Sequence, residues 1–171
     1  MATALQNLSD YDPSGVPSAQ ELSFGIVVSE WNSEITSNLH QGAVEALVDC
    51  GALSANIQTI HVPGSFELIY GAKHLIDQKK YDAVIVIGSV IQGATRHFEF
   101  VCQGVTQGIK DLNIQTNTPV IFCVLTDDTL EQAQERSGGK HGNKGVEAAI
   151  TAIKMAQLKK TLAEPEKKIG F

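Results

Sequence analysis

The segment from Gln92 to His97 holds residues whose types and spacing suit chemistry. Gly93 lets the backbone turn closely, and we expect residues 94–96 to open a helix whose unpaired N–H groups attract a phosphate. His97 is then one turn inside that helix, where an imidazole can act as a general acid or base near neutral pH. The alternative for His97 is a core histidine whose ring nitrogens are satisfied. The segment predicts an anion site beside a proton-transfer group.

Two cations frame a glycine-rich stretch later in the chain. Arg136 precedes the stretch, residues 137–143, and Lys144 follows it. Such a pair can clamp a phosphate, because the guanidinium offers a planar fork and the ammonium a point charge. The alternative is two solvated side chains at a helix end, and the spacing alone favours that interpretation.

Trp31 and Glu67 are further candidates. Trp31 is the only tryptophan and follows an apolar run, where its flat face can stack on a heteroaromatic ring, with structural packing as the alternative. Glu67 lies near the start of an apolar helical segment. It either contacts a ligand or is simply stabilised by the positive end of the helix.

The overall composition limits the class of protein. Thirteen Lys and Arg face 19 Asp and Glu, a net charge of −6, so we expect no nucleic acid and no anionic membrane surface as partner. The three cysteines lack CxxC spacing and the histidines lack ligand spacing, which predicts neither disulfides nor a metal site. No apolar run approaches the roughly 20 residues of a membrane span, and no secretory signal pattern is present. The expected compartment is the cytoplasm.

Short, β-branched apolar runs alternate with segments of helical period. The runs cover residues 24–29, 57–62, 83–87 and 119–125. This alternation predicts an α/β fold in which a four-stranded parallel sheet carries helices on both faces. Ligands bind beyond the carboxyl ends of such strands, and the candidate residues follow those ends.

Local patterns predict further details. Phe66 and Ile69 should begin the inner face of the second helix, and Asp128 with Glu131 has the spacing of a capping box for a later one. Gly138-Gly139 should break that later helix.

The chain divides into three parts. Residues 1–23 lack hydrophobic periodicity, which predicts an amino-terminal arm without a core of its own. Residues 24–158 are predicted to form the domain, and residues 159–171 a charged, frayed tail.

The strand-end segments are more specific together than singly. They are Trp31-Asn32 and residues 62–67, 88–98, 124–126 and 131–145. In order, spacing and residue type, residues 24–158 resemble the lumazine synthase family, the 6,7-dimethyl-8-ribityllumazine synthases of riboflavin biosynthesis. The resemblance implies a three-layer αβα, flavodoxin-like domain. The family frequently has Phe where this chain has Trp31, and the Trp implies weak flavin binding. Ser89 and Gln92 also differ from the residues that are common in the family.

The resemblance implies a transferase that condenses 5-amino-6-(ribitylamino)uracil with 3,4-dihydroxy-2-butanone 4-phosphate. The products are 6,7-dimethyl-8-ribityllumazine, phosphate and water, and no metal or organic cofactor is implied. His97 is the implied catalytic residue, which moves protons.

The implied substrate-binding residues divide by the part of the substrates that they contact. Those expected at the pyrimidine are Trp31, Ser89, Val90 and Ile91, with Phe122 from a neighbouring subunit. Phe66 is a further implied substrate-binding residue. Those expected around the ribityl chain are Asn32, Ser65, Glu67 and Lys144. Those expected to hold the phosphate are Gly93, Ala94, Thr95 and Arg136.

The resemblance also implies a homo-oligomer, a pentamer whose active sites are shared. Family members that form only pentamers often carry extra residues between the last two helices. Residues 136–145 have no such insertion, which favours a 60-subunit icosahedral shell. The arm, residues 1–23, is expected to add a strand to a neighbouring subunit. Riboflavin synthase is a further candidate partner. Two alternatives stay open: a non-catalytic flavin-binding module, and a structural cage.

Overall fold

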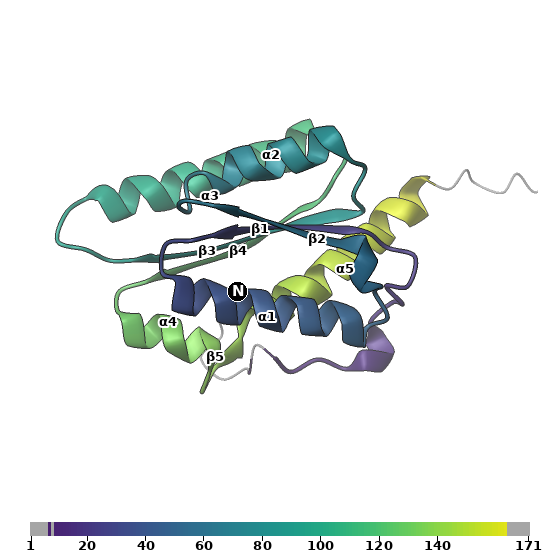
Figure 1. Cartoon of the computed structure of the whole chain (residues 1–171), viewed down its shortest axis with the longest axis horizontal. Coiled ribbons are helices and arrows are strands. Elements are labelled where there is room, and N and C mark those ends of the chain that lie inside the picture. Colours follow the sequence, from purple (N-terminus) through teal and green to yellow (C-terminus); the bar gives the residue numbers. More distant parts are fainter. Residues whose placement is uncertain (1–6, 8, 164–171) are drawn as a thin grey trace, which may run out of the picture.

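A computed structural model describes residue 7 and residues 9–163, and within them a four-stranded sheet forms the centre of the molecule (Figure 1). All neighbouring strands are parallel, in the order β2-β1-β3-β4. The strands are β1 (Phe24–Ser29), β2 (Ile57–Val62), β3 (Ala83–Ile91) and β4 (Val120–Asp127). The predicted parallel sheet is confirmed.

Helices cover both faces of this sheet. They are α1 (Ser33–Asp49), α2 (Leu68–Gln78), α3 (His97–Gln115), α4 (Leu130–Arg136) and α5 (Lys144–Ala163). Helices α2 and α3 lie on one face, and α1, α4 and α5 lie on the other (Figure 1). The three-layer αβα arrangement is confirmed. Within the described part of the chain, no helix combines the length and the apolar character needed to cross a membrane.

The central strand β3 explains why both faces are covered. Ile85 and Ile87 are buried in the core with α1 and α5, whereas Val84 and Val86 are buried in the core with α2 and α3. Successive side chains of a strand point to opposite faces, so a strand that is apolar at every position must be covered on both. The two cores hold the carboxyl ends of the strands at one edge of the sheet.

Two strands run further than the sequence predicted. β3 continues past Ile87 to Ile91, and β4 ends at Asp127. Residues 89–91 pair in register with residues 125–127. This backbone pairing continues β3 past Gly88 and Ser89, which interrupt its apolar run, and extends β4 to Asp127.

The start of α3 differs from the prediction. The helix begins at His97, so residues 94–96 form a bend before it, and His97 is the first helical residue rather than one turn inside. Because β3 continues to Ile91, the chain turns back toward the helix layer later than the apolar pattern suggested.

The expected inner face of α2 is partly wrong. The helix begins at Leu68, so Phe66 precedes it and is 53% exposed. Its ring lies against Gly104 of α3, where the absence of a side chain leaves room, instead of packing on the sheet.

The α4 helix begins one residue later than its capping pattern predicted. Thr129 is the N-cap, and its Oγ1 accepts a hydrogen bond from the Gln132 backbone N at 3.2 Å. The Gln132 side chain in turn accepts from the Asp128 backbone N at 2.8 Å. Thr129 thus takes the N-cap role expected of Asp128, while the Gln132 side chain bonds to the N–H of the residue before the N-cap, so the capping box is not fully reciprocal.

The glycine-rich stretch between α4 and α5 forms a small hairpin. Its strands are β5 (Ser137–Gly139) and β6 (Gly142–Asn143), which pair antiparallel. Gly138 has φ +119° and Gly142 φ +79°, values that favour glycine. The predicted break after α4 is confirmed.

Part of the segment before β1, which was predicted to have no core of its own, packs against the core of the domain. Ala19 and Leu22 are buried in the same core as α1 and α5, and the Ala19 N–H donates to the Cys50 carbonyl at 2.9 Å. These apolar residues have no regular period, so only the tertiary structure reveals their burial. Residues 1–6 and 8 of the arm lie outside the described residues.

The last helix extends into the expected tail. α5 runs to Ala163, so residues 159–163 are helical. Lys159 Nζ donates to the Tyr81 carbonyl at 3.2 Å, a contact that ties this part of the helix to the domain. The rest of the tail, residues 164–171, lies outside the described residues.

Candidate active site

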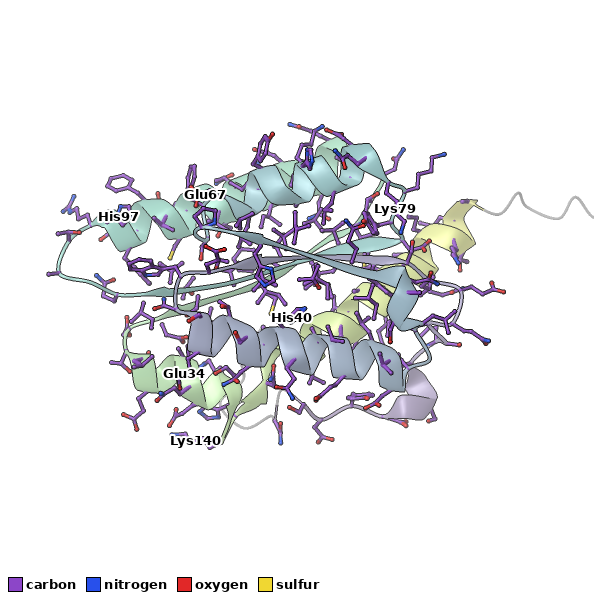
Figure 2. All side chains as sticks on the ribbon, viewed as in Figure 1. Glu34, His40, Glu67, Lys79, His97 and Lys140 are labelled. Atoms are coloured by element: carbon purple, nitrogen blue, oxygen red, sulfur yellow. The ribbon has the colours of Figure 1, made fainter. Side chains whose placement is uncertain are left out.

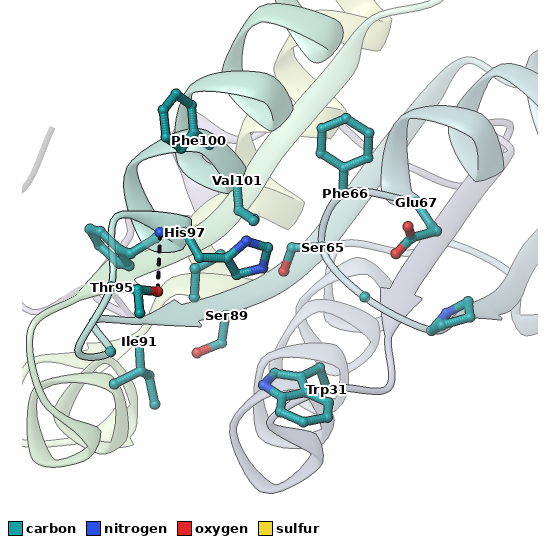
Figure 3. Close-up of a pocket in the computed structure, with 15 residues that line it drawn as sticks. Trp31, Ser65, Phe66, Glu67, Ser89, Ile91, Thr95, His97, Phe100 and Val101 are labelled. Carbon is teal, nitrogen blue, oxygen red and sulfur yellow. Dashed lines mark hydrogen bonds between the residues drawn. The ribbon is translucent and has the colours of Figure 1, made fainter.

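A cleft of about 740 Å³ opens at the carboxyl ends of the strands, beside the starts of α2 and α3 (Figure 3). It contains most of the residues that the sequence singled out. These are Trp31, Ser65, Phe66, Glu67, Ser89, Val90, Ile91, Gly93, Thr95 and His97. The β1–α1 and β2–α2 connections, the end of β3, the bend after it and the start of α3 supply them, so segments far apart in sequence meet at one edge of the sheet.

Backbone hydrogen bonds place Trp31 at this cleft. The Glu30 N–H donates to the Val62 carbonyl at 2.8 Å, and the Trp31 N–H donates to the Pro63 carbonyl at 3.1 Å. The tryptophan itself is 71% exposed. Figure 3 shows it across the cleft from Val101. An indole fixed through its backbone and exposed on its faces is suited to stack on a planar ligand.

Two glycines bring Ser65 and Phe66 into the cleft wall. A Cβ on Gly88 would lie 2.7 Å from Ser65 Oγ, and a Cβ on Gly104 would lie 2.6 Å from the Phe66 ring. Both distances are too short for ordinary carbon contacts. The wall therefore depends on the close approach of β3 and α3 to the β2–α2 connection.

His97 provides the imidazole of the cleft. It is exposed at the first position of α3, and its backbone N–H donates to Thr95 Oγ1 at 3.4 Å. Figure 3 shows its ring directed toward Ser65, and Figure 2 shows His97 and Glu67 on the side of the sheet occupied by α2 and α3. An imidazole facing a cleft can donate and accept protons near neutral pH.

Ser89 lies deepest among the polar residues of the cleft. It is 1% exposed, and its Oγ has no hydrogen-bond partner among the described residues. An unpaired buried hydroxyl costs about 1–3 kcal/mol. A ligand that hydrogen-bonds to this hydroxyl would remove that cost.

Several predicted site residues do not line this cleft. They are Asn32, Ala94, Phe122, Arg136 and Lys144. Asn32 is nevertheless close, since its Nδ2 donates to the Ser89 carbonyl at 2.9 Å. Ala94 lies in the bend between Gly93 and Thr95, which both line the cleft.

The remaining three lie on or beyond β4. Arg136 Nε is 3.8 Å from Asp127 Oδ1, and Lys144 Nζ donates to Glu147 Oε1 at 2.6 Å. Phe122 is 38% exposed on β4, which is an edge strand of the sheet. The structure therefore does not bring Phe122, Arg136 and Lys144 into the cleft of their own chain.

The sequence reading missed several lining residues. These are Pro63, Gly64, Phe98, Phe100 and Val101. Phe100 and Val101 lie three and four positions after His97, on the same helix face. This spacing from His97 is the signal in the sequence that points to them.

The cysteines contribute no reactive thiol to this region. Cys123 is buried, and burial raises its pKa to about 12, so the thiol stays protonated and inert. Across the described residues, no group of three or more His, Cys, Asp or Glu side chains is arranged to hold a metal ion. The groups that the cleft offers are an indole, an imidazole, a carboxylate, hydroxyls and backbone amides.

Comparisons with known proteins cover the same residues. A family model described as 6,7-dimethyl-8-ribityllumazine synthase matches residues 21–160. A protein of that name from Flavobacterium psychrophilum is 63% identical over 159 residues, which are 93% of this chain and 84% of that protein. Proteins of the same name from Christiangramia forsetii and Porphyromonas gingivalis are 62% and 55% identical over 94% of this chain, and over 96% and 99% of their own lengths. Since the family model spans all four strands and the whole cleft, this chain belongs to the 6,7-dimethyl-8-ribityllumazine synthase family.

Proposed function

We propose that the cleft condenses 5-amino-6-(ribitylamino)uracil with 3,4-dihydroxy-2-butanone 4-phosphate to give 6,7-dimethyl-8-ribityllumazine, phosphate and water. Family membership makes the chain a transferase of riboflavin biosynthesis that acts on small molecules. The observation that carries the assignment to this cleft is the meeting of Trp31 from the β1–α1 connection, Ser89 from β3 and His97 from the start of α3 around one cavity.

Trp31 and Ser89 suit the pyrimidine. The exposed indole offers a stacking face, and the buried Ser89 hydroxyl has no partner among the described residues, as a group reserved for a ligand would. Residues 89–91 end β3 beside them, so their backbone groups are candidates for bonds to the ring edges. Glu67, Ser65 and the neighbouring Asn32 are the proposed contacts of the ribityl chain.

The phosphate is proposed to bind at the bend before α3. Gly93 and Thr95 line the cleft, and α3 begins immediately afterwards, so its unpaired N–H groups and positive end face this region. His97 at that helix start is the proposed proton-transfer group during imine formation and phosphate elimination.

The division of labour follows from the reaction. An amine and a carbonyl combine readily once they are held together, so positioning supplies most of the acceleration. Proton transfer by His97 is expected to contribute about 100- to 10,000-fold.

A neighbouring copy is proposed to complete each cleft. Phe122, Arg136 and Lys144 lie outside the cleft of their own chain, and Phe122 is exposed on an edge strand. A pentamer brings such an edge to the next subunit, and closure of pentamers into a 60-subunit shell is the proposed higher assembly. The arm before β1 would add a strand to a neighbour, and riboflavin synthase is the proposed enzyme partner. The cytoplasm is the proposed site of the reaction.

The direct test is the formation of the lumazine chromophore, followed by absorbance or fluorescence with the purified full chain and both substrates. We expect turnover, a reduced but measurable rate for His97→Ala, and a parental rate for the exposed His74→Ala. Riboflavin binding without any lumazine formation would contradict the proposal and favour a flavin-binding module. Sedimentation tests the assembly separately, where pentamers alone at high concentration would exclude the shell.

A further inference from the structure

Asp127 is a buried carboxylate at the carboxyl end of β4. Its side chain is 8% exposed, and Oδ1 lies 3.8 Å from Nε of Arg136 on α4. The other carboxylate oxygen, Oδ2, is buried without a hydrogen-bond partner among the described residues. Arg136 is therefore the principal compensation for a charge that has been withdrawn from water.

The backbone of Asp127 contacts the start of the Gly93 bend in its own chain. Its carbonyl accepts a hydrogen bond from the Gln92 N–H at 2.9 Å, and Asp127 pairs in register with Ile91. The bend that contains Gly93 starts at this bond. Asp127 thus contacts this bend with its main chain and, with its side chain, the Arg136 guanidinium, which is proposed to serve the cleft of a neighbouring copy.

The guanidinium of Arg136 is restrained from two sides. Nη1 donates to the Gln132 carbonyl at 2.8 Å, while Nε faces the Asp127 carboxylate. Arg136 keeps its Nη2 group beyond these contacts, and its side chain is 28% exposed. Contacts at Nε and at Nη1 fix the plane of the guanidinium and leave the Nη2 donors available for an anion.

The charge on Asp127 is unfavourable for folding. Burial raises the pKa of the Asp127 carboxyl above its ordinary value, and Arg136 opposes that rise. An asparagine would keep the backbone bond to Gln92 and avoid a buried charge. Because the ionised form of Asp127 is costly in the folded state, its presence is best explained by the effect of its charge on Arg136.

We propose that Asp127 is a positioning residue, which holds the Arg136 guanidinium in the orientation that receives the phosphate of the butanone substrate. This inference rests on the proposed function, in which Arg136 binds that phosphate. Asp127 itself does not contact substrate, so its effect should operate entirely through Arg136.

A double-mutant cycle tests this dependence. The variants are Asp127→Asn, Arg136→Ala and the combination, with Asp128→Asn as the control that removes an exposed carboxylate one position away. The measurements are the KM for each of the two substrates, the inhibition constant of inorganic phosphate, and the midpoint of denaturant unfolding.

We expect Asp127→Asn to raise the KM for the phosphorylated substrate and the phosphate inhibition constant by about 3- to 30-fold, which lies within the range of coupling between residues in contact. The KM for the pyrimidine should stay at the parental value, and the unfolding midpoint should not fall. In the Arg136→Ala background, Asp127→Asn should cause no further change. The control should match the parent in every measurement.

Other outcomes separate the two ideas. If Arg136→Ala weakens phosphate binding but Asp127→Asn does not, the positioning role is wrong and the role of Arg136 stands. If Asp127→Asn acts equally in both backgrounds, the effect does not pass through Arg136 and the inference is overturned. If Arg136→Ala changes nothing, the phosphate role of Arg136 and the positioning role of Asp127 both fail. Should Asp127→Asn not fold, Asp127→Ser replaces it in the same cycle.

Discussion

The side-chain amide of Asn32 donates a hydrogen bond to the Ser89 carbonyl at 2.9 Å, and this bond joins the start of α1 to β3. Asn32 adopts a left-handed conformation, with φ 57° and ψ 47°, which Asn tolerates better than most residues. The bond holds Trp31, its chain neighbour, beside the buried Ser89 hydroxyl. Asn32 thus shapes the cleft from just outside it.

Replacing Asn32 should separate the hydrogen bond from the backbone conformation. Asn32→Gly keeps the left-handed conformation and loses the bond, so unfolding free energy should fall by about 1 kcal/mol. Asn32→Ala also adds strain, for a further loss of about 1 kcal/mol. Denaturant unfolding of the two variants measures the difference. Equal stability of both would show that the conformation at Asn32 relaxes.

Gly145 allows α5 to pack closely on α1. A Cβ at this position would lie 1.9 Å from the Leu39 carbonyl oxygen, which is backbone and cannot rotate away. Gly145→Ala should therefore push the two helices apart and lower the unfolding free energy by about 1–3 kcal/mol or more. Gly15→Ala is the matched control, since its Cβ would meet only Asp12 Oδ2, at 4.0 Å. A parental unfolding midpoint for Gly145→Ala would contradict this packing.

His40 should make stability depend on pH. It is a residue of α1, its Nε2 is 2.9 Å from Thr59 Oγ1 on β2, and Figure 2 shows where it lies. Burial, with a smaller effect from His61, lowers the pKa of His40 below its ordinary value of 6.5. Below pH 6.5 the unfolded chain therefore binds a proton that the folded chain resists, so stability falls as pH decreases.

His40→Gln should reduce this loss. Unfolding free energies measured at about pH 7.5 and about pH 5.5 should differ less in the variant than in the parent. The exposed His74→Gln on α2 is the control and should keep the parental pH dependence. The prediction fails if His40→Gln and the parent lose equal stability.

Trp31 should report ligands in the cleft by its fluorescence. It is the only tryptophan of the chain, and it is 71% exposed at the cleft. Stacking of riboflavin on the indole should quench emission in a saturable manner, whereas inorganic phosphate, which has no ring, should not. N-acetyltryptophanamide corrects for light absorption by the flavin. Quenching no greater than that of the free indole would exclude the predicted stacking.

The fold could be predicted where apolar patterns were strong. The runs at residues 24–29 and 57–62 match β1 and β2 residue for residue, because β-branched runs bounded by polar and turn-forming residues have few alternatives. The ends of β3 and β4 could not be predicted in this way. Each continues because the other pairs with it, and a single strand contains no information about its partner's length.

The candidate site shows the same division. The sequence by itself determined which residue types gather at the strand ends, since parallel strands bring their carboxyl ends to one edge. Only the tertiary structure decided that Trp31, Ser89 and His97 share one cleft, while Phe122, Arg136 and Lys144 lie outside it. It also decided that Asn32 bonds to the Ser89 carbonyl and that Asp127 faces Arg136. These relationships depend on the packing of helices against the sheet, which sets distances that no local spacing encodes.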